Sequence, residues 1–219
     1  MNRPFVQSVG LPPEKYADRI VAEMLRYTVA AQTRRWADVQ RVLDNRNDGN
    51  PRGQAKMVKR LELAGGAFFY DVLLEPGKRG KYTVHVLDVA GWDPAKEEVI
   101  TEVDAIPSKP WLACMVTKIE SKGRHRYDDK SAVALLVTHH AMSRLAQRCG
   151  AKEPKDLIWA VHAIWSRYFE VRKNPSISLP DGHRMRVRLG DPWGDCYAVL
   201  RKGDKKDYVV TTILGPDGL

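Results

Sequence analysis

The stretch that decides the fold is residues 131–150, which read SAVALLVTHHAMSRLAQRCG. Its first part, SAVALLVT, is an apolar run that predicts either a buried strand or the start of a buried helix. The following segment, HHAMSRLAQRCG, predicts a short helix that Gly150 closes. Thr138 lies directly before this helix and is a suitable N-cap, because its hydroxyl oxygen can accept a backbone N–H of the first turn.

The rest of the C-terminal part continues as a helix and then strands. Residues 152–173 repeat apolar side chains at helical spacing, which predicts a second helix. Three short β-rich runs follow at 183–190, 195–203 and 207–214, separated by turn-forming residues as in an antiparallel meander. Helices followed by strands are typical of an α+β fold. We therefore predict a C-terminal domain over residues 131–219, with two helices packed on an antiparallel sheet.

The N-terminal part, residues 1–121, predicts a separate α+β region with helices first and a β-hairpin after them. Two runs within residues 12–47 repeat apolar side chains at helical spacing, and residues 53–66 predict a further helix that ends on glycines. The strand candidates are the hairpin at 67–89 and the runs at 97–106 and 111–121. The charged segment 122–130 is turn-like, and we place the domain boundary there.

Basic residues are concentrated in the C-terminal part. The chain has 36 Lys and Arg against 27 Asp and Glu, for a net charge of +9. From Lys122 onward there are 18 basic and 11 acidic residues, whereas the first 121 residues hold 18 and 16. Such an excess favours a polyanion such as nucleic acid as the partner. A basic protein with no such partner would have the same composition.

Several classes of protein are excluded or find no support. No run of 18 apolar residues exists, which excludes a membrane span, and the N-terminus lacks the apolar core of a secretory signal. We therefore expect a cytoplasmic protein. Cys114, Cys149 and Cys196 lie far apart and show no metal-ligand spacing, so we expect reduced, mostly buried thiols and neither a metal site nor a cofactor. Nucleotide-binding fingerprints and the HExxH motif are absent.

His140, Arg144 and Arg148 form the sharpest candidate constellation. Their spacing of four places them along one side of the predicted helix. Next to them is an apolar stripe formed by Ala141, Met142, Leu145, Ala146 and Cys149. Histidine can move a proton near neutral pH, and arginine can bind phosphate and stabilise developing negative charge. These residue types suit metal-independent cleavage of RNA by its own 2′-hydroxyl. A helix-edge histidine paired with nearby polar groups would give the same pattern without catalysis.

This stretch resembles the BrnT-type and RelE-type ribonuclease toxins, small bacterial and phage domains of the barnase–EndoU–colicin–RelE group. The shared pattern is His140-Ala141-x-x-Arg144-x-x-x-Arg148, followed by a helix, antiparallel strands and a last strand that here reads VVTTI over residues 209–213. The resemblance implies helices packed on a four-stranded antiparallel sheet. It also implies metal-independent RNA cleavage, with His140, Arg144 and Thr211 as the site residues. Gln147 stands where that group usually has Glu.

Other basic and histidine residues allow two interpretations each. Arg184, Arg186 and Arg188 alternate along a predicted strand and therefore share one face, either as an RNA-backbone track or as charges that protect a sheet edge. His139 is the rival of His140, about 100° further round the helix. His162, near Trp159, is more typical of a packed histidine than of a catalyst. In the N-terminal part, RRWADVQRVLDNRN and KMVKR form either a nucleic-acid-facing surface or a solvated helix face.

The sequence thus predicts an RNA-cleaving enzyme with RNA as its partner. His140 would act as general acid or base, Arg144 and Arg148 would bind phosphate, and Thr211 would donate a hydrogen bond to it. The N-terminal part would select the target or neutralise the activity, and a protein inhibitor is a further candidate partner. The alternative is a non-catalytic protein on a toxin-like scaffold that binds RNA or a host protein.

Overall fold

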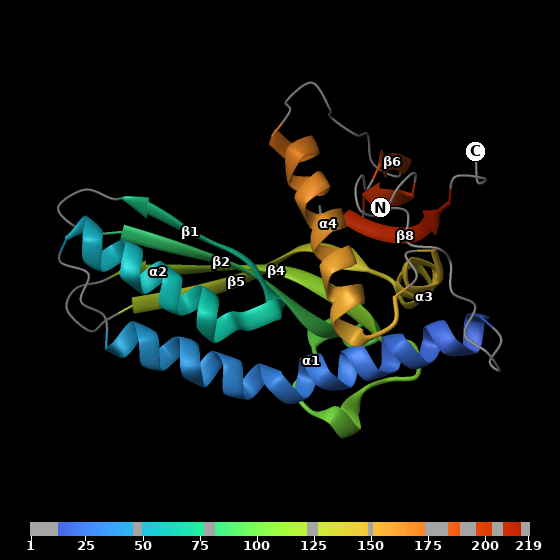
Figure 1. Ribbon diagram of the computed structural model, residues 1–219, viewed down its shortest axis with the longest axis horizontal. Coiled ribbons are helices and arrows are strands. Elements are labelled where there is room, and N and C mark those ends of the chain that lie inside the picture. Colours follow the sequence, from blue (N-terminus) through green and yellow to red (C-terminus); the bar gives the residue numbers. More distant parts are fainter. Residues whose placement is uncertain are drawn as a thin grey trace.

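The structure is a computed structural model of the 219-residue chain (Figure 1). It describes residues 13–45, 50–76, 82–121, 127–148, 151–173, 184–188, 196–202 and 208–215. Within these ranges, the side chains of residues 13, 70, 76, 121, 127–129, 171–173 and 184–187 lie outside the description. The predictions for Cys149, Gly150 and residues 122–126 also fall outside the described residues.

The N-terminal helices follow the predicted apolar spacing, but the first two predicted runs form one helix. Helix α1 (Pro13–Asp44) is continuous over 32 residues. Helix α2 (Pro51–Gly65) begins after its N-cap Asn50, whose side-chain oxygen accepts a hydrogen bond from the Gly53 nitrogen at 2.9 Å. Gly66 follows with a φ of 56°, which favours glycine because other residues have a Cβ that clashes there. The predicted glycine end of α2 is confirmed.

In the described residues, eight strands form one sheet in the order β1-β2-β4-β5-β8-β7-β6, with β3 paired to β2. The strands are β1 (Phe69–Pro76), β2 (Tyr82–Asp93), β3 (Glu98–Val99), β4 (Trp111–Ser121), β5 (Tyr127–Val137), β6 (Arg184–Arg188), β7 (Tyr197–Lys202) and β8 (Tyr208–Leu214). Helices α3 (His139–Arg148) and α4 (Pro154–Lys173) separate β5 from β6 in the chain. The predicted hairpin, the strand at 111–121 and the C-terminal meander are confirmed, and SAVALLVT belongs to a strand.

Two local predictions are wrong. Residues 97–106 were predicted to form a strand, but they contain only the short strand β3 and a 3-10 turn, η3 (Val103–Ala105). Strand β3 pairs only with the end of β2, and residues 101–105 are exposed, so no neighbouring strand extends it. Residues 127–130, predicted as a turn, begin β5 and pair with β4. Ladder hydrogen bonds to a neighbouring strand extend β5 through this charged segment, which propensity alone does not favour.

The sheet is mixed, so the expectation of a purely antiparallel C-terminal sheet is wrong at one pair. Strands β5 and β8 run parallel, with Leu136 opposite Val209 and Val137 opposite Val210. Parallel neighbours need a long connection, and the chain between β5 and β8 supplies α3, α4, β6 and β7. The pairs β6–β7 and β7–β8 are antiparallel as predicted. Strand β5 pairs with β4 on one side and with β8 on the other. One sheet therefore contains strands from both sides of segment 122–130, where we placed the domain boundary.

Two apolar clusters cover the sheet, and α1 contributes to both. The first cluster contains buried residues of α1, α3, α4 and strands β2, β4, β5, β7 and β8. The second contains the C-terminal half of α1 with α2, β1, β2 and β4. In β2, Val84 and Val86 belong to the second cluster, whereas Leu87 and Val89 belong to the first. Since successive strand side chains point to opposite faces, β2 is covered on both faces at this point.

Candidate nucleic-acid site

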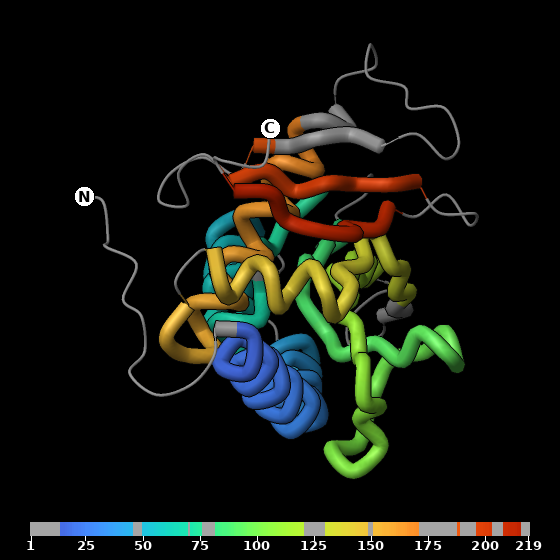
Figure 2. The backbone as a smooth tube through the Cα atoms, turned by 90° about the vertical axis from the view of Figure 1, so that its right-hand side faces the viewer, coloured from blue at the N-terminus to red at the C-terminus, as the bar shows by residue number. Residues whose placement is uncertain are grey.

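Helix α3 lies between α1 and β8 (Figure 2), and Thr138 fixes its first turn against β8. The hydroxyl oxygen of Thr138 accepts a hydrogen bond from the Ala141 nitrogen at 3.1 Å, which confirms the predicted N-cap. The same hydroxyl donates to the carbonyl oxygen of Thr211 at 3.4 Å. The backbone nitrogen of Thr138 donates to the carbonyl oxygen of Val210 at 3.1 Å. The start of α3 is therefore joined to the strand that carries Thr211.

Two sides of α3 pack against the rest of the protein. The predicted apolar stripe is buried in the first cluster and includes Ala141, Met142, Leu145 and Ala146. The neighbouring side contacts α1, where Ser143 Oγ donates to Asp18 Oδ1 at 2.6 Å and His139 Nε2 lies 3.7 Å from the same oxygen. Burial lowers the pKa of His139, although Asp18 acts in the opposite direction. His139 thus belongs to the α1–α3 contact.

The remaining side of α3 carries His140, Arg144 and Arg148. His140 is exposed, and both arginines are half-buried. Arg144 Nη1 donates to Gln147 Oε1 at 3.0 Å. Arg148 lies against the end of β8, where a methyl group added to Gly215 would be 3.5 Å from Arg148 Nη1. This nitrogen is buried and has no hydrogen-bond partner among the described residues. This side of the helix therefore carries one imidazole and two guanidinium groups. We call His140, Arg144 and Arg148 the α3 row.

Thr211 lies at a β-bulge in β8. Val199 is opposite Thr212 and Leu200 is opposite Val210, so Thr211 has no opposite residue in β7. Its hydroxyl donates to the carbonyl oxygen of Val199 at 3.2 Å. Thr211 is thus linked to α3 through its own carbonyl, while its hydroxyl proton is directed into the sheet. A hydrogen bond from this hydroxyl to a phosphate would require it to leave Val199.

The three arginines predicted as a nucleic-acid track lie on β6, the last strand in the order of the described sheet. Arg184 pairs with Arg201, Arg186 with Val199, and Arg188 with Tyr197. Alternate positions of a strand share one face. The side chains of Arg184 and Arg186 lie outside the described residues, and that of Arg188 is exposed. Strand β7 lies between β6 and β8, the strand that α3 contacts.

Sequence reasoning missed a buried ion pair between α1 and β2. Arg35 Nη2 lies 3.5 Å from Asp88 Oδ2, and the two side chains are only 3% and 2% exposed. Arg35 Cζ is also 4.7 Å from the ring centre of Phe68. Burial raises the pKa of Asp88 to about 6 against the opposing effect of Arg35, and burial lowers the pKa of Arg35. The available signal was a single carboxylate within the apolar strand sequence VHVLDVAG.

The other candidate side chains are packed in the core. His162 is buried with its ring 5.4 Å from that of Trp159, and burial lowers its pKa to about 4. Cys114 and Cys196 are buried free thiols, as predicted. Burial, reinforced by Asp88, raises the pKa of the Cys114 thiol. None of these groups is arranged for proton transfer at a surface.

Comparison of the chain with protein-family models, with curated proteins and with solved structures found no match. In the described ranges, no group of three or more His, Cys, Asp and Glu side chains is arranged to hold a metal ion. Within the same ranges, no helix is long and apolar enough to cross a bilayer.

Proposed function

We propose that the protein binds RNA through the α3 row. The observation that carries this proposal is that neither Arg144 nor Arg148 has a carboxylate partner among the described residues. Arg144 bonds to the neutral Gln147, whereas Asp18 is engaged on the α1 side of the helix. Guanidinium groups whose charge no carboxylate compensates can bind phosphate by charge-assisted, often bidentate hydrogen bonds.

The charge distribution and the sequence resemblance support RNA as the polyanion. The C-terminal part holds most of the net positive charge, and α3 belongs to this part. In this proposal, residues 131–219 form the ribonuclease-like part, in which α3 and α4 pack on the sheet. Residues 1–121 extend the same sheet through β4 and provide α1 as the support for α3.

Fluorescence anisotropy with a labelled single-stranded RNA tests this proposal. Arg144→Gln combined with Arg148→Gln should weaken binding about ten-fold or more. It should also reduce the slope of log K against log salt by about 1.4, because each phosphate contact on a single strand contributes about 0.7. The matched control, Arg19→Gln with Arg167→Gln, removes two arginines that already pair with glutamates and should keep the wild-type slope. An unchanged slope in the α3 variant would refute the proposal.

Cleavage of the bound RNA is the second candidate function, and the exposure of His140 favours it. Its imidazole is open to solvent on the same side of α3 as Arg144, where it could exchange a proton with a ribose hydroxyl. Purified protein should then cut RNA in EDTA, leave DNA of the same sequence intact, and lose activity in His140→Ala and Arg144→Ala. His139→Ala is the matched control, because His139 faces α1. Cleavage that survives both α3 substitutions would exclude this site.

A further inference from the structure

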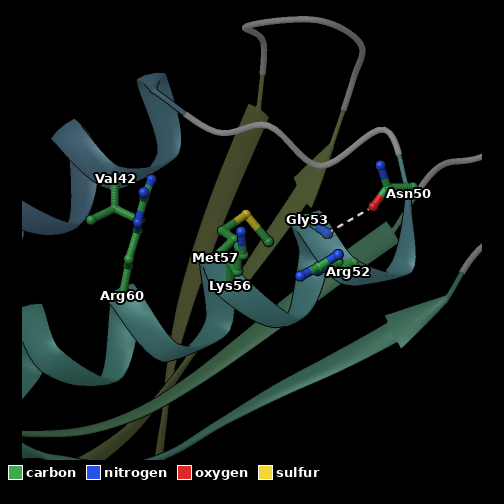
Figure 3. Close-up of a pocket in the computed structure, with 7 residues that line it drawn as sticks. All are labelled: Val42, Asn50, Arg52, Gly53, Lys56, Met57 and Arg60. Carbon is green, nitrogen blue, oxygen red and sulfur yellow. Dashed lines mark hydrogen bonds between the residues drawn. The ribbon is translucent and has the colours of Figure 1, made fainter.

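A groove between the C-terminal end of α1 and helix α2 has three cations among its seven lining residues (Figure 3). Its volume is about 400 Å³. Arg52, Lys56 and Arg60 line it from α2, with Met57 at its buried side and Val42 of α1 opposite. None of the described lining residues is acidic. The groove is therefore suited to an anion.

The three cations form a row along α2, in which each position is rotated about 40° from the one before it. Their spacing of four residues places them on one side of the helix, about 6 Å apart for each step of four. All three are exposed, and none forms an ion pair within the described residues. Helix α2 has four basic residues and one acidic residue, Glu62. A row of uncompensated charges matches a series of phosphate groups better than a single anion.

Two exposed aromatic side chains lie beyond the C-terminal end of this row. Tyr27 of α1 is 56% exposed and Trp159 of α4 is 53% exposed. The Tyr27 ring lies 5.1 Å from that of Phe68, which is in the 3-10 turn η1 (Gly66–Phe68) directly after α2. The Trp159 ring lies 5.4 Å from that of His162, whose imidazole lies close to the Phe68 backbone. Buried Phe68 and His162 thus connect the two exposed rings.

The end of α2 and the turn η1 connect the cations to the two rings. Arg60 is about one and a half helical turns before the end of α2, and η1 then leads to Phe68 and the two rings. Single exposed aromatic residues are common on proteins. This pair is informative because both rings rest on the same buried floor at the end of a cationic row. We call the surface formed by Arg52, Lys56, Arg60, Tyr27 and Trp159 the α2 track.

We propose that the α2 track binds a single-stranded polynucleotide, with its phosphates on the three cations and unpaired bases stacked on Tyr27 and Trp159. Cationic grooves combined with aromatic rings bind single strands because every unpaired base offers a π-face, whereas a duplex hides these faces. The track contacts phosphates and base faces and not the sugar, so RNA and DNA strands of equal length should bind alike. This surface lies on elements other than α3 and is independent of the α3 row.

The cationic half is tested by anisotropy with labelled 20-nucleotide RNA and DNA strands and a hairpin duplex, using the full chain. Arg52→Gln, Lys56→Gln and Arg60→Gln together should reduce the salt slope by about 2, since three phosphate contacts contribute about 0.7 each. The control triple variant Arg19→Gln, Lys96→Gln and Lys155→Gln removes the same charge from cations that already pair with acids. It should bind with the wild-type slope.

The aromatic half has a different signature. Tyr27→Ala and Trp159→Ala should each weaken single-strand binding about 5- to 150-fold without changing the salt slope. Leu73→Ala removes an exposed apolar side chain from β1 and should bind as the wild type. Because about half of each substituted side chain is exposed, every variant should keep a cooperative thermal transition with only a small decrease in its midpoint.

The α3 variant Arg144→Gln with Arg148→Gln separates the two surfaces. The α2 track is overturned if its cation variant keeps the wild-type slope, if the aromatic variants keep the wild-type affinity, or if the duplex binds as tightly as the single strands. If only the α3 variant reduces the slope of log K against log salt, the α2 track is overturned and the α3 proposal stands. If only the triple cation variant of α2 reduces this slope, the α2 track is supported and the α3 proposal is overturned.

Discussion

Replacing Arg35 by methionine should destabilise the protein by about 3–5 kcal/mol at pH 7, because it leaves the Asp88 carboxylate in the core without its cation. The side chains of this pair are 3% and 2% exposed, so water cannot replace the lost partner. Arg35 also donates to the carbonyl oxygen of Val89 at 3.4 Å and lies over the Phe68 ring. Methionine retains much of the volume, which isolates the loss of charge from the loss of packing.

The effect of pH follows from the raised pKa of Asp88. Its pKa is about 6 in the folded protein, compared with its usual 3.8, so the folded state holds the proton more tightly than the unfolded state. The contribution of Asp88 to the free energy of unfolding is therefore greatest below about pH 4. It falls by about 3 kcal/mol as the pH rises to about 6 and is then constant. Asp88→Asn should remove this pH dependence, and Arg35→Met should extend it to higher pH, because Arg35 lowers the pKa of Asp88.

Urea unfolding of these variants between pH 4 and 8 measures both effects. The matched control is Arg19→Met, which breaks an exposed ion pair with Glu23 on the same helix and should cost less than about 1 kcal/mol. Combining Arg35→Met with Asp88→Leu should restore most of the stability, since an apolar pair of similar volume leaves no charge in the core. A loss below about 1 kcal/mol in Arg35→Met, with the pH profile of the wild type, would refute the argument.

Three further predictions concern packing, capping and thiol reactivity. Gly65→Ala should destabilise the protein by about 1–3 kcal/mol in urea unfolding, because a Cβ there would overlap the Phe69 ring, whereas Gly215→Ala meets only ordinary contacts and should change stability by less than about 1 kcal/mol. Thr138→Ala should cost about 0.5–2 kcal/mol and Thr138→Ser much less, because only the serine keeps the N-cap; equal losses in the two variants would argue against capping. In a Cys149→Ser background, the buried thiols of Cys114 and Cys196 should not react with a thiol reagent until the protein unfolds, and rapid reaction of the folded protein would contradict their burial.

Local sequence patterns determined a large part of the secondary structure. The glycine end of α2, the hairpin of β1 and β2, and the Thr138 cap each depend on residues close together in the chain. The α3 row is also a local feature, because spacing by four fixes which side chains share one side of a helix. For these elements, neighbouring residues carry the physical information, and the structure agrees with the prediction.

Tertiary structure decided the features that join distant segments. SAVALLVT is a strand because β4 and β8 pair with β5 on its two sides. The parallel β5–β8 pair depends on the long connection between these strands, which includes α3 and α4. The Arg35–Asp88 pair, the β-bulge at Thr211 and the shared floor of Tyr27 and Trp159 each depend on partners far apart in sequence. The periodicity of a sequence indicates which side of a helix or strand is apolar, but it does not indicate which other element packs against that side. The packing of distant elements against one another brought these groups together.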